Sequence, residues 1–201
     1  MPDSRLRLRI AVFVSGGGTN LQALIDGKRE GAFQSDLALV VSNKPEAYGL
    51  ERARQAGIPT FVEGGDKSLI QALEDHEIDF IVLAGYLKII GQDLLEKYQG
   101  RIINIHPSLL PAYGGMGMYG LRVHEAVFKN GEDFSGATVH FVTEEVDGGH
   151  IILQLKTNIR KASSPEAIQK QVLRLEHVAL KLALSLIEEE DIEIRTFVRN
   201  R

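Results

Sequence analysis

The stretch LRLRIAVFVSGGGTN, residues 6–20, decides the fold class of this chain. Its first part runs from alternating to continuous apolar character and is rich in β-branched residues, which is the pattern of a strand entering a buried sheet. Three glycines, Gly16 to Gly18, follow at once, and an amphipathic segment extends from Leu21 to about Arg29. A strand, a glycine turn and a helix in this order indicate the opening unit of an α/β protein.

The same alternation continues to about residue 105. Strands that alternate with helical segments of about ten residues imply right-handed crossovers and a parallel sheet covered on both faces. We therefore predict a doubly wound, Rossmann-like α/β domain. The predicted strands lie at residues 37–42, 60–62, 80–84 and 102–105, and the predicted helices at 46–55, 67–75 and 92–98.

The pattern changes at residues 106–120, HPSLLPAYGGMGMYG, which hold two prolines and four glycines. We predict a long loop there, of a kind that is usually functional inside a compact domain. A helix follows near residues 122–129. The next two predicted strands, 137–142 and 151–156, are too close for a crossover helix, so they indicate an antiparallel extension of the sheet.

Ser164 and Pro165 mark the start of a helix that is predicted to run to about residue 188. Its apolar stripe includes Leu175 and Leu182 at helical spacing. A last strand is predicted at residues 192–198.

The composition is that of an ordinary globular protein, with 44% hydrophobic and 25% charged residues. A net charge of -4 offers no basic surface for nucleic acid. The absence of cysteine excludes disulfides, thiolate zinc sites and a cysteine nucleophile. No stretch reaches the ~20 apolar residues of a membrane span, and none resembles a signal peptide, so a cytoplasmic protein is expected.

The glycines at residues 16–18 stand between a strand and a helix, where exposed backbone amides favour an anion. A dinucleotide site would need a third spaced glycine where Leu21 stands, and an acidic residue near Ser42 and Asn43. No lysine of a triphosphate-binding loop follows the glycines either. A monophosphate or sugar phosphate is therefore the predicted ligand, and a tight turn without a ligand is the alternative.

Asn104 and His106 lie two residues apart at the end of a predicted strand, so they share one face at its carboxyl edge. Ligands of open α/β sheets bind at this edge. An amide donor beside a titratable donor suits the oxyanion that forms when a carbonyl carbon is attacked. A structural histidine at a strand end is the alternative.

His140 shares a strand face with Thr138, and Asp147 begins a glycine-rich turn that could return its carboxylate to His106. An aspartate beside a histidine raises the pKa of the histidine and favours its cationic form. Acid–base chemistry is one interpretation of Asp147, and a local backbone hydrogen bond in the turn is the other.

Two further features concern buried charge and metal binding. Glu176 projects from an apolar helix flank, so its carboxylate needs either a polar ligand or a salt-bridge partner. His106, His140, Asp147 and His150 lack the short spacing of common zinc motifs, and no metal site is predicted.

Sequence blocks spread over nearly the whole chain resemble the glycinamide ribonucleotide formyltransferases, folate-dependent enzymes of purine synthesis. The resemblance implies one formyltransferase domain over residues 1–201, with a phosphate-binding half at about 1–100 and a folate-binding, catalytic half at about 101–201. It also implies transfer of the formyl group of 10-formyltetrahydrofolate to the amine of 5'-phosphoribosyl-glycinamide, in IMP biosynthesis. The blocks are IAVFVSGGGTNLQALID, VVSNKPEAYGLERARQAGIP, IVLAGYLKII, NIHPSLLPAYGG and GATVHFVTEEVDGGHIILQ.

Matching the family position by position assigns roles to individual residues. The implied catalytic residues are Asn104, His106 and Asp147, supported by Ser108, Thr138 and His140. The implied contacts to the phosphoribosyl substrate are Gly18, Thr19, Asn20 and Glu176. The implied folate contacts are Leu87, Lys88, Ile89, Ile90, Asn104, Val142, Thr143, Glu144, Glu145 and Val146. The chain departs from the family pattern at Met116, His150 and Leu173, to which no role is assigned.

Three other functions are weighed against this one. A length of 201 residues and a net charge of -4 argue against methionyl-tRNA formyltransferase, which carries a further domain and needs a basic surface. Formyltetrahydrofolate hydrolase, which uses water as the acceptor, is one alternative, and a non-catalytic folate or sugar-phosphate binding protein is the other. Small-molecule substrates, no nucleic acid, no membrane and a monomer or homodimer are expected.

Overall fold

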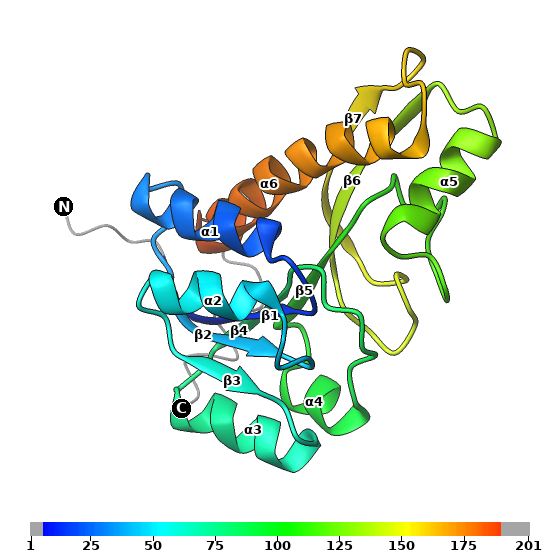
Figure 1. Cartoon of the computed structure of the whole chain (residues 1–201). Coiled ribbons are helices and arrows are strands. Elements are labelled where there is room, and N and C mark those ends of the chain that lie inside the picture. The colour runs from blue at the N-terminus through cyan, green and yellow to red at the C-terminus, as the bar shows by residue number, and fades with distance from the viewer. Residues whose placement is uncertain (1–5, 190–201) are drawn as a thin grey trace.

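Residues 6–189 are described by a computed structural model, and seven strands in them form one sheet (Figure 1). The strand order is β3-β2-β1-β4-β5-β6-β7. Strands β1 to β5 are parallel, whereas β6 pairs antiparallel with both β5 and β7. The doubly wound class and the antiparallel extension are thus confirmed. The strands are β1 (Arg9–Val14), β2 (Asp36–Ser42), β3 (Thr60–Val62), β4 (Phe80–Leu83), β5 (Ile102–His106), β6 (Phe134–Phe141) and β7 (Ile151–Asn158).

Strand β1 explains why the sheet has two covered faces. Its side chains alternate between the faces. Ile10 and Val12 belong to one buried apolar cluster, while Ala11 and Phe13 belong to the other. A strand buried on both sides has to be apolar at successive positions, which is what the sequence of β1 provides.

The helices divide between these two faces (Figure 1). Helices α1 (Thr19–Arg29), α2 (Tyr48–Gln55) and α6 (Pro165–Glu189) contribute to the first apolar cluster. Helices α3 (Asp66–Asp75) and α4 (Gln92–Lys97) contribute to the second. Helix α5 (Leu121–Lys129) packs beside α6. In the described residues no helix is both long and apolar enough to cross a membrane.

Three details differ from the sequence-based predictions or lie beyond them. The first strand begins at Arg9 rather than Leu6, because the amide of Leu6 donates to the carbonyl of Glu188 instead of to a strand. Leu182 was predicted to be buried but is 47% exposed, since the buried face of α6 passes through Ala179 and Ala183. The strand predicted at 192–198 lies outside the described residues.

Candidate active site

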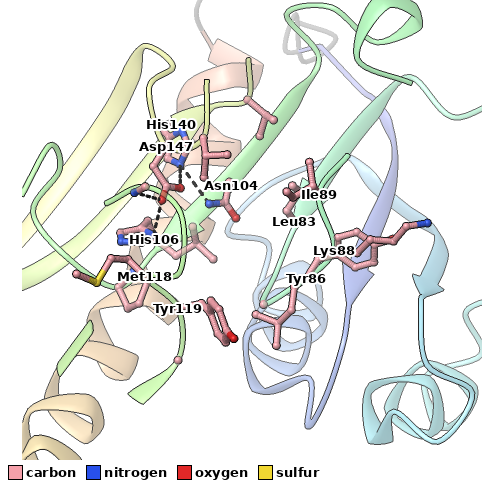
Figure 2. A pocket seen from close by; sticks show the side chains of 18 of the residues that line it. Leu83, Tyr86, Lys88, Ile89, Asn104, His106, Met118, Tyr119, His140 and Asp147 are labelled. Carbon is pink, nitrogen blue, oxygen red and sulfur yellow. Dashed lines mark hydrogen bonds and ion pairs between the residues drawn. The ribbon is translucent and has the colours of Figure 1, made fainter. Parts of the chain in front are cut away.

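A cavity of about 940 Å³ opens at the carboxyl edge of the parallel strands. Its walls come from the segments that follow β1, β4, β5 and β6 and from one side of α6 (Figure 2). All three predicted catalytic residues and every predicted folate contact line this cavity. The structure thus brings these residues together at the edge of the sheet where open α/β folds bind ligands.

Asn104 and His106 project into the cavity from alternate positions of β5, as predicted (Figure 2). The Nε2 atom of His106 lies 2.8 Å from the carbonyl oxygen of Tyr113, an acceptor, so this nitrogen donates. His106 is only 4% exposed. The ring is therefore fixed by β5 on one side and by the loop at residues 107–120 on the other.

Asp147 closes the cluster. Its backbone has a φ of 57°, which an aspartate tolerates better than most residues, and this turn brings the carboxylate back over β5. Oδ2 accepts a hydrogen bond of 2.9 Å from the amide of Gly115 and lies 3.4 Å from Nδ1 of His106. Oδ1 lies 3.5 Å from Nε2 of His140. The predicted return of Asp147 to His106 is confirmed.

The charge state of this cluster follows from burial and from its neighbours. Burial acts to raise the pKa of Asp147, but His140, His106 and the Gly115 amide together bring that pKa below its ordinary value. Burial lowers the pKa of His106, and the Asp147 charge and the Tyr113 carbonyl only partly offset this effect. Asp147 acts to raise the pKa of His106, as predicted, but the net pKa is lowered because desolvation of the ring exceeds the attraction of one carboxylate. The expectation that the cationic form is favoured is therefore wrong.

His140 orients Asn104. Its Nδ1 lies 2.8 Å from the carbonyl oxygen of Phe141 and so carries the hydrogen. Its Nε2 lies 3.2 Å from Nδ2 of Asn104 and faces Oδ1 of Asp147 at 3.5 Å. The contact with His140 occupies at most one N–H of Asn104, so the other can donate into the cavity.

The other two supporting residues do not line the cavity. Thr138 donates to the carbonyl of Ser108 at 2.6 Å and accepts from the amide of Leu110 at 3.1 Å. Ser108 in turn donates to the carbonyl of Ala112 at 2.6 Å. Thr138 thus holds the start of the loop at residues 107–120 against β6, and Ser108 braces the loop internally, so both act on the site through the backbone.

At the glycine loop, the structure brings only part of the predicted phosphoribosyl contacts into the cavity. Thr19 and Glu176 line it, whereas Gly18 and Asn20 do not. Asn20 reaches the wall indirectly, since its Nδ2 donates to Oε2 of Glu176 at 2.7 Å. Burial raises the pKa of Glu176, although the Asn20 hydrogen bond acts against it. A carboxylate held in this way is suited to accept from hydroxyl groups of a ligand.

The wall of the cavity at residues 87–90 is mainly apolar, and contacts with Glu63 and Ser15 hold it in place. Leu87 and Ile89 line the cavity and are 53% and 63% exposed, so a flat apolar ligand could cover both. The ammonium of Lys88 lies 2.8 Å from Oε1 of Glu63. The Leu87 amide donates to the hydroxyl of Ser15 at 2.8 Å, which ties this wall to the end of β1.

Several lining residues were not found by the sequence analysis. Met118, Tyr119, His124 and Lys170 all line the cavity. His124 is buried, and burial together with His106 lowers its pKa to about 4. Lys170 lies three residues before Leu173, and Leu173 lies three residues before Glu176, so following this row of cavity-lining positions along α6 could have found it. The loop residues carry no periodic signal. No cluster of three or more potential metal ligands occurs among residues 6–189.

The fold and this cluster define a class of protein, and comparison with known families gives the same one. Residues 8–184 match the formyl transferase family, so the chain belongs to that family. The chain is 42% identical to the chloroplastic phosphoribosylglycinamide formyltransferase of Arabidopsis thaliana over 199 residues, covering 94% of this chain and 68% of that one. It is 40% identical to the phosphoribosylglycinamide formyltransferase of Escherichia coli over 187 residues, covering 89% and 86%.

Solved structures agree with these relatives. Glycinamide ribonucleotide transformylase 1 from Symbiobacterium toebii superposes with a TM-score of 0.84 at 37% identity, covering 91% of this chain and 88% of that one. A formyltetrahydrofolate deformylase from Pseudomonas syringae has a TM-score of 0.82 at 26% identity and covers 93% and 63%.

Proposed function

We propose that this chain is an enzyme that transfers the formyl group of 10-formyltetrahydrofolate to the amine of 5'-phosphoribosyl-glycinamide in purine biosynthesis. One observation carries the proposal: a single cavity joins the start of α1 and Glu176, the Asn104–His106–Asp147 cluster and the apolar wall at residues 87–90. The first part suits a sugar phosphate, the second a reacting carbonyl group and the third a pterin ring. The names of the Arabidopsis and E. coli relatives support the same reaction.

The substrates divide between the two ends of the cavity. The phosphoribosyl part would lie between Thr19 and Glu176, with its phosphate at the amides that begin α1. The folate would cover Leu87 and Ile89 and extend along residues 142–146. The proposed single domain therefore draws its folate site from both halves of the chain.

The chemistry takes place at the cluster between them. The amine nitrogen attacks the formyl carbon, a C–N bond forms, and the carbonyl oxygen becomes an anion. The free N–H of Asn104 and a ring N–H of His106 would donate to that oxygen, a type of contact worth roughly 3 kcal/mol per donor in other enzymes. In the structure the Nε2 hydrogen of His106 goes to the carbonyl of Tyr113, so the substrate oxygen has to replace that carbonyl.

Asp147 completes the proton balance. The anion forming beside His106 raises the pKa of its ring, which would take a proton from solvent and return it when the carbonyl re-forms. The ionised Asp147 would stabilise this imidazolium. The proton that the amine loses would pass by way of Asp147 to N10 of the folate. As the carbonyl re-forms, the C–N10 bond breaks and N10 leaves as a neutral amine.

An acceptor-dependence assay tests the proposal. The purified protein is mixed with 10-formyltetrahydrofolate, and loss of this compound is followed with and without 5'-phosphoribosyl-glycinamide. We expect turnover only when the amine is present. Equal turnover without the amine would identify a hydrolase, the activity of the deformylase that shares the fold, and no turnover in either case would identify a binding protein.

A further inference from the structure

Arg52 on α2 holds the glycine loop from outside the wall of the large cavity. Its Nε donates to the carbonyl oxygen of Gly17 at 2.7 Å, and its Nη1 donates to Oε1 of Gln22 at 3.1 Å. The guanidinium also lies 5.1 Å from the centre of the Tyr48 ring. Arg52 lines a separate hollow of about 310 Å³ and is not part of the wall of the large cavity.

The neighbouring carbonyls of the loop are held in the same manner. The carbonyl of Gly16 accepts from the amide of Gly49 at 2.9 Å, and that of Gly18 accepts from the amide of Gln22 at 2.9 Å. Gly49 stands in the first turn of α2, where amides have no partner within the helix. A Cβ on Gly18 would lie 2.6 Å from Cα of Gly49, so the loop and α2 touch directly.

The orientation of the carbonyls fixes the orientation of the amides. In a planar trans peptide, the C=O and the following N–H point in opposite directions. The Gly17 carbonyl, which Arg52 holds, shares its peptide with the amide of Gly18. Within residues 6–189 this amide and that of Gly17 make no hydrogen bond, so both are free to bind an anion.

We infer that Arg52 is a positioning residue for the phosphate of the substrate, which it does not touch. Glycine has no Cβ to restrict its backbone, so the Gly17 peptide could rotate and present its carbonyl oxygen to the phosphate. The hydrogen bond from Arg52 prevents this rotation, and its charge adds to the positive potential behind the loop. The inference rests on the proposed function, since it assigns the phosphate to this loop.

Kinetics of Arg52→Met and Arg52→Lys, with Arg54→Met as the control, test the inference. Arg54 stands on the same helix and pairs with Glu51 at the surface, so its loss removes the same charge without touching the loop. For Arg52→Met we expect the KM for 5'-phosphoribosyl-glycinamide to rise about tenfold or more, because a charged hydrogen bond is lost. The kcat and the KM for 10-formyltetrahydrofolate should stay unchanged in Arg52→Met. The KM of Arg52→Lys for 5'-phosphoribosyl-glycinamide should lie between those of Arg52→Met and the parent protein. Arg54→Met should have the same KM as the parent protein.

A substrate without phosphate separates positioning from general support of the fold. With the glycinamide riboside as acceptor, Arg52→Met should be as efficient as the parent protein. An equal loss with the riboside, or a parallel rise in both KM values, would overturn the inference. If the parent protein is inactive, the proposed function fails, and calorimetric titration with inorganic phosphate then tests the inference. Arg52→Met should bind phosphate more weakly than the parent protein. Equal binding by the two proteins would contradict the inference.

Discussion

Asp147 is the residue on which the other charges of the cluster depend. It faces His106 through one carboxylate oxygen and His140 through the other, and the Gly115 amide binds it from the loop. Its pKa lies below the ordinary value, so it is ionised at neutral pH. Since burial lowers the pKa of His106, the Asp147 charge is what keeps protonation of the ring within reach during the reaction.

Replacing Asp147 by Asn should lower the pKa of His106 further, because the charge that raises it is removed. The imidazolium would then form at lower pH, and kcat should fall about 100-fold or more, in line with the loss of an acid–base group. An NMR titration of the His106 ring in both proteins measures the first effect. Asp133→Asn, which alters an exposed ion pair with Arg160, serves as the control, and a His106 pKa that stays the same or rises in Asp147→Asn would contradict this role.

At the scale of elements, the loop at residues 107–120 is held by the antiparallel hairpin of β6 and β7. Thr138 on β6 binds the carbonyl of Ser108 and the amide of Leu110. Gln154 on β7 donates both to the Thr138 hydroxyl and to the carbonyl of Leu110. The hairpin therefore does more than widen the sheet: it fixes the loop that carries Tyr113 against His106.

Thr138→Val should lower the free energy of unfolding by about 1–3 kcal/mol, since it keeps the shape of the side chain but leaves a buried amide and carbonyl without their partner. Equilibrium unfolding in urea measures this loss. Thr157→Val on the adjacent strand is the control, because the Thr157 hydroxyl makes no hydrogen bond within the described part of the chain. Equal stability of Thr138→Val and the parent would show that the loop is held by other contacts.

Elements and catalytic positions were predictable from sequence where a local pattern specifies them. The continuous apolar run of β1 and the glycines after it predict a strand and a turn, and the spacing of Asn104 and His106 puts both on one face. Contacts that depend on distant packing were not predictable in this way. Examples are Arg52, which meets the loop 35 positions earlier in the chain, and His106, whose pKa direction depends on how deeply the ring is buried.

At the scale of the whole molecule, the site lies where the strand order reverses. Strand β1 has β2 on one side and β4 on the other, so the connections leave the sheet in opposite directions and open a crevice between β1 and β4. The glycine loop follows β1 and the apolar wall follows β4, and the Ser15 hydroxyl bonds to the Leu87 amide between them. Both proposed substrates would thus bind at one crevice, next to the cluster on β5.

The fate of the formyl carbon is the most direct test of the account. The protein is incubated with 10-formyltetrahydrofolate labelled with carbon-13 in the formyl group, together with 5'-phosphoribosyl-glycinamide, and the products are identified by NMR. We predict that the label appears as an N-formyl group on the phosphoribosyl product, in an amount equal to the tetrahydrofolate formed. Label that appears as free formate instead would contradict formyl transfer to the amine.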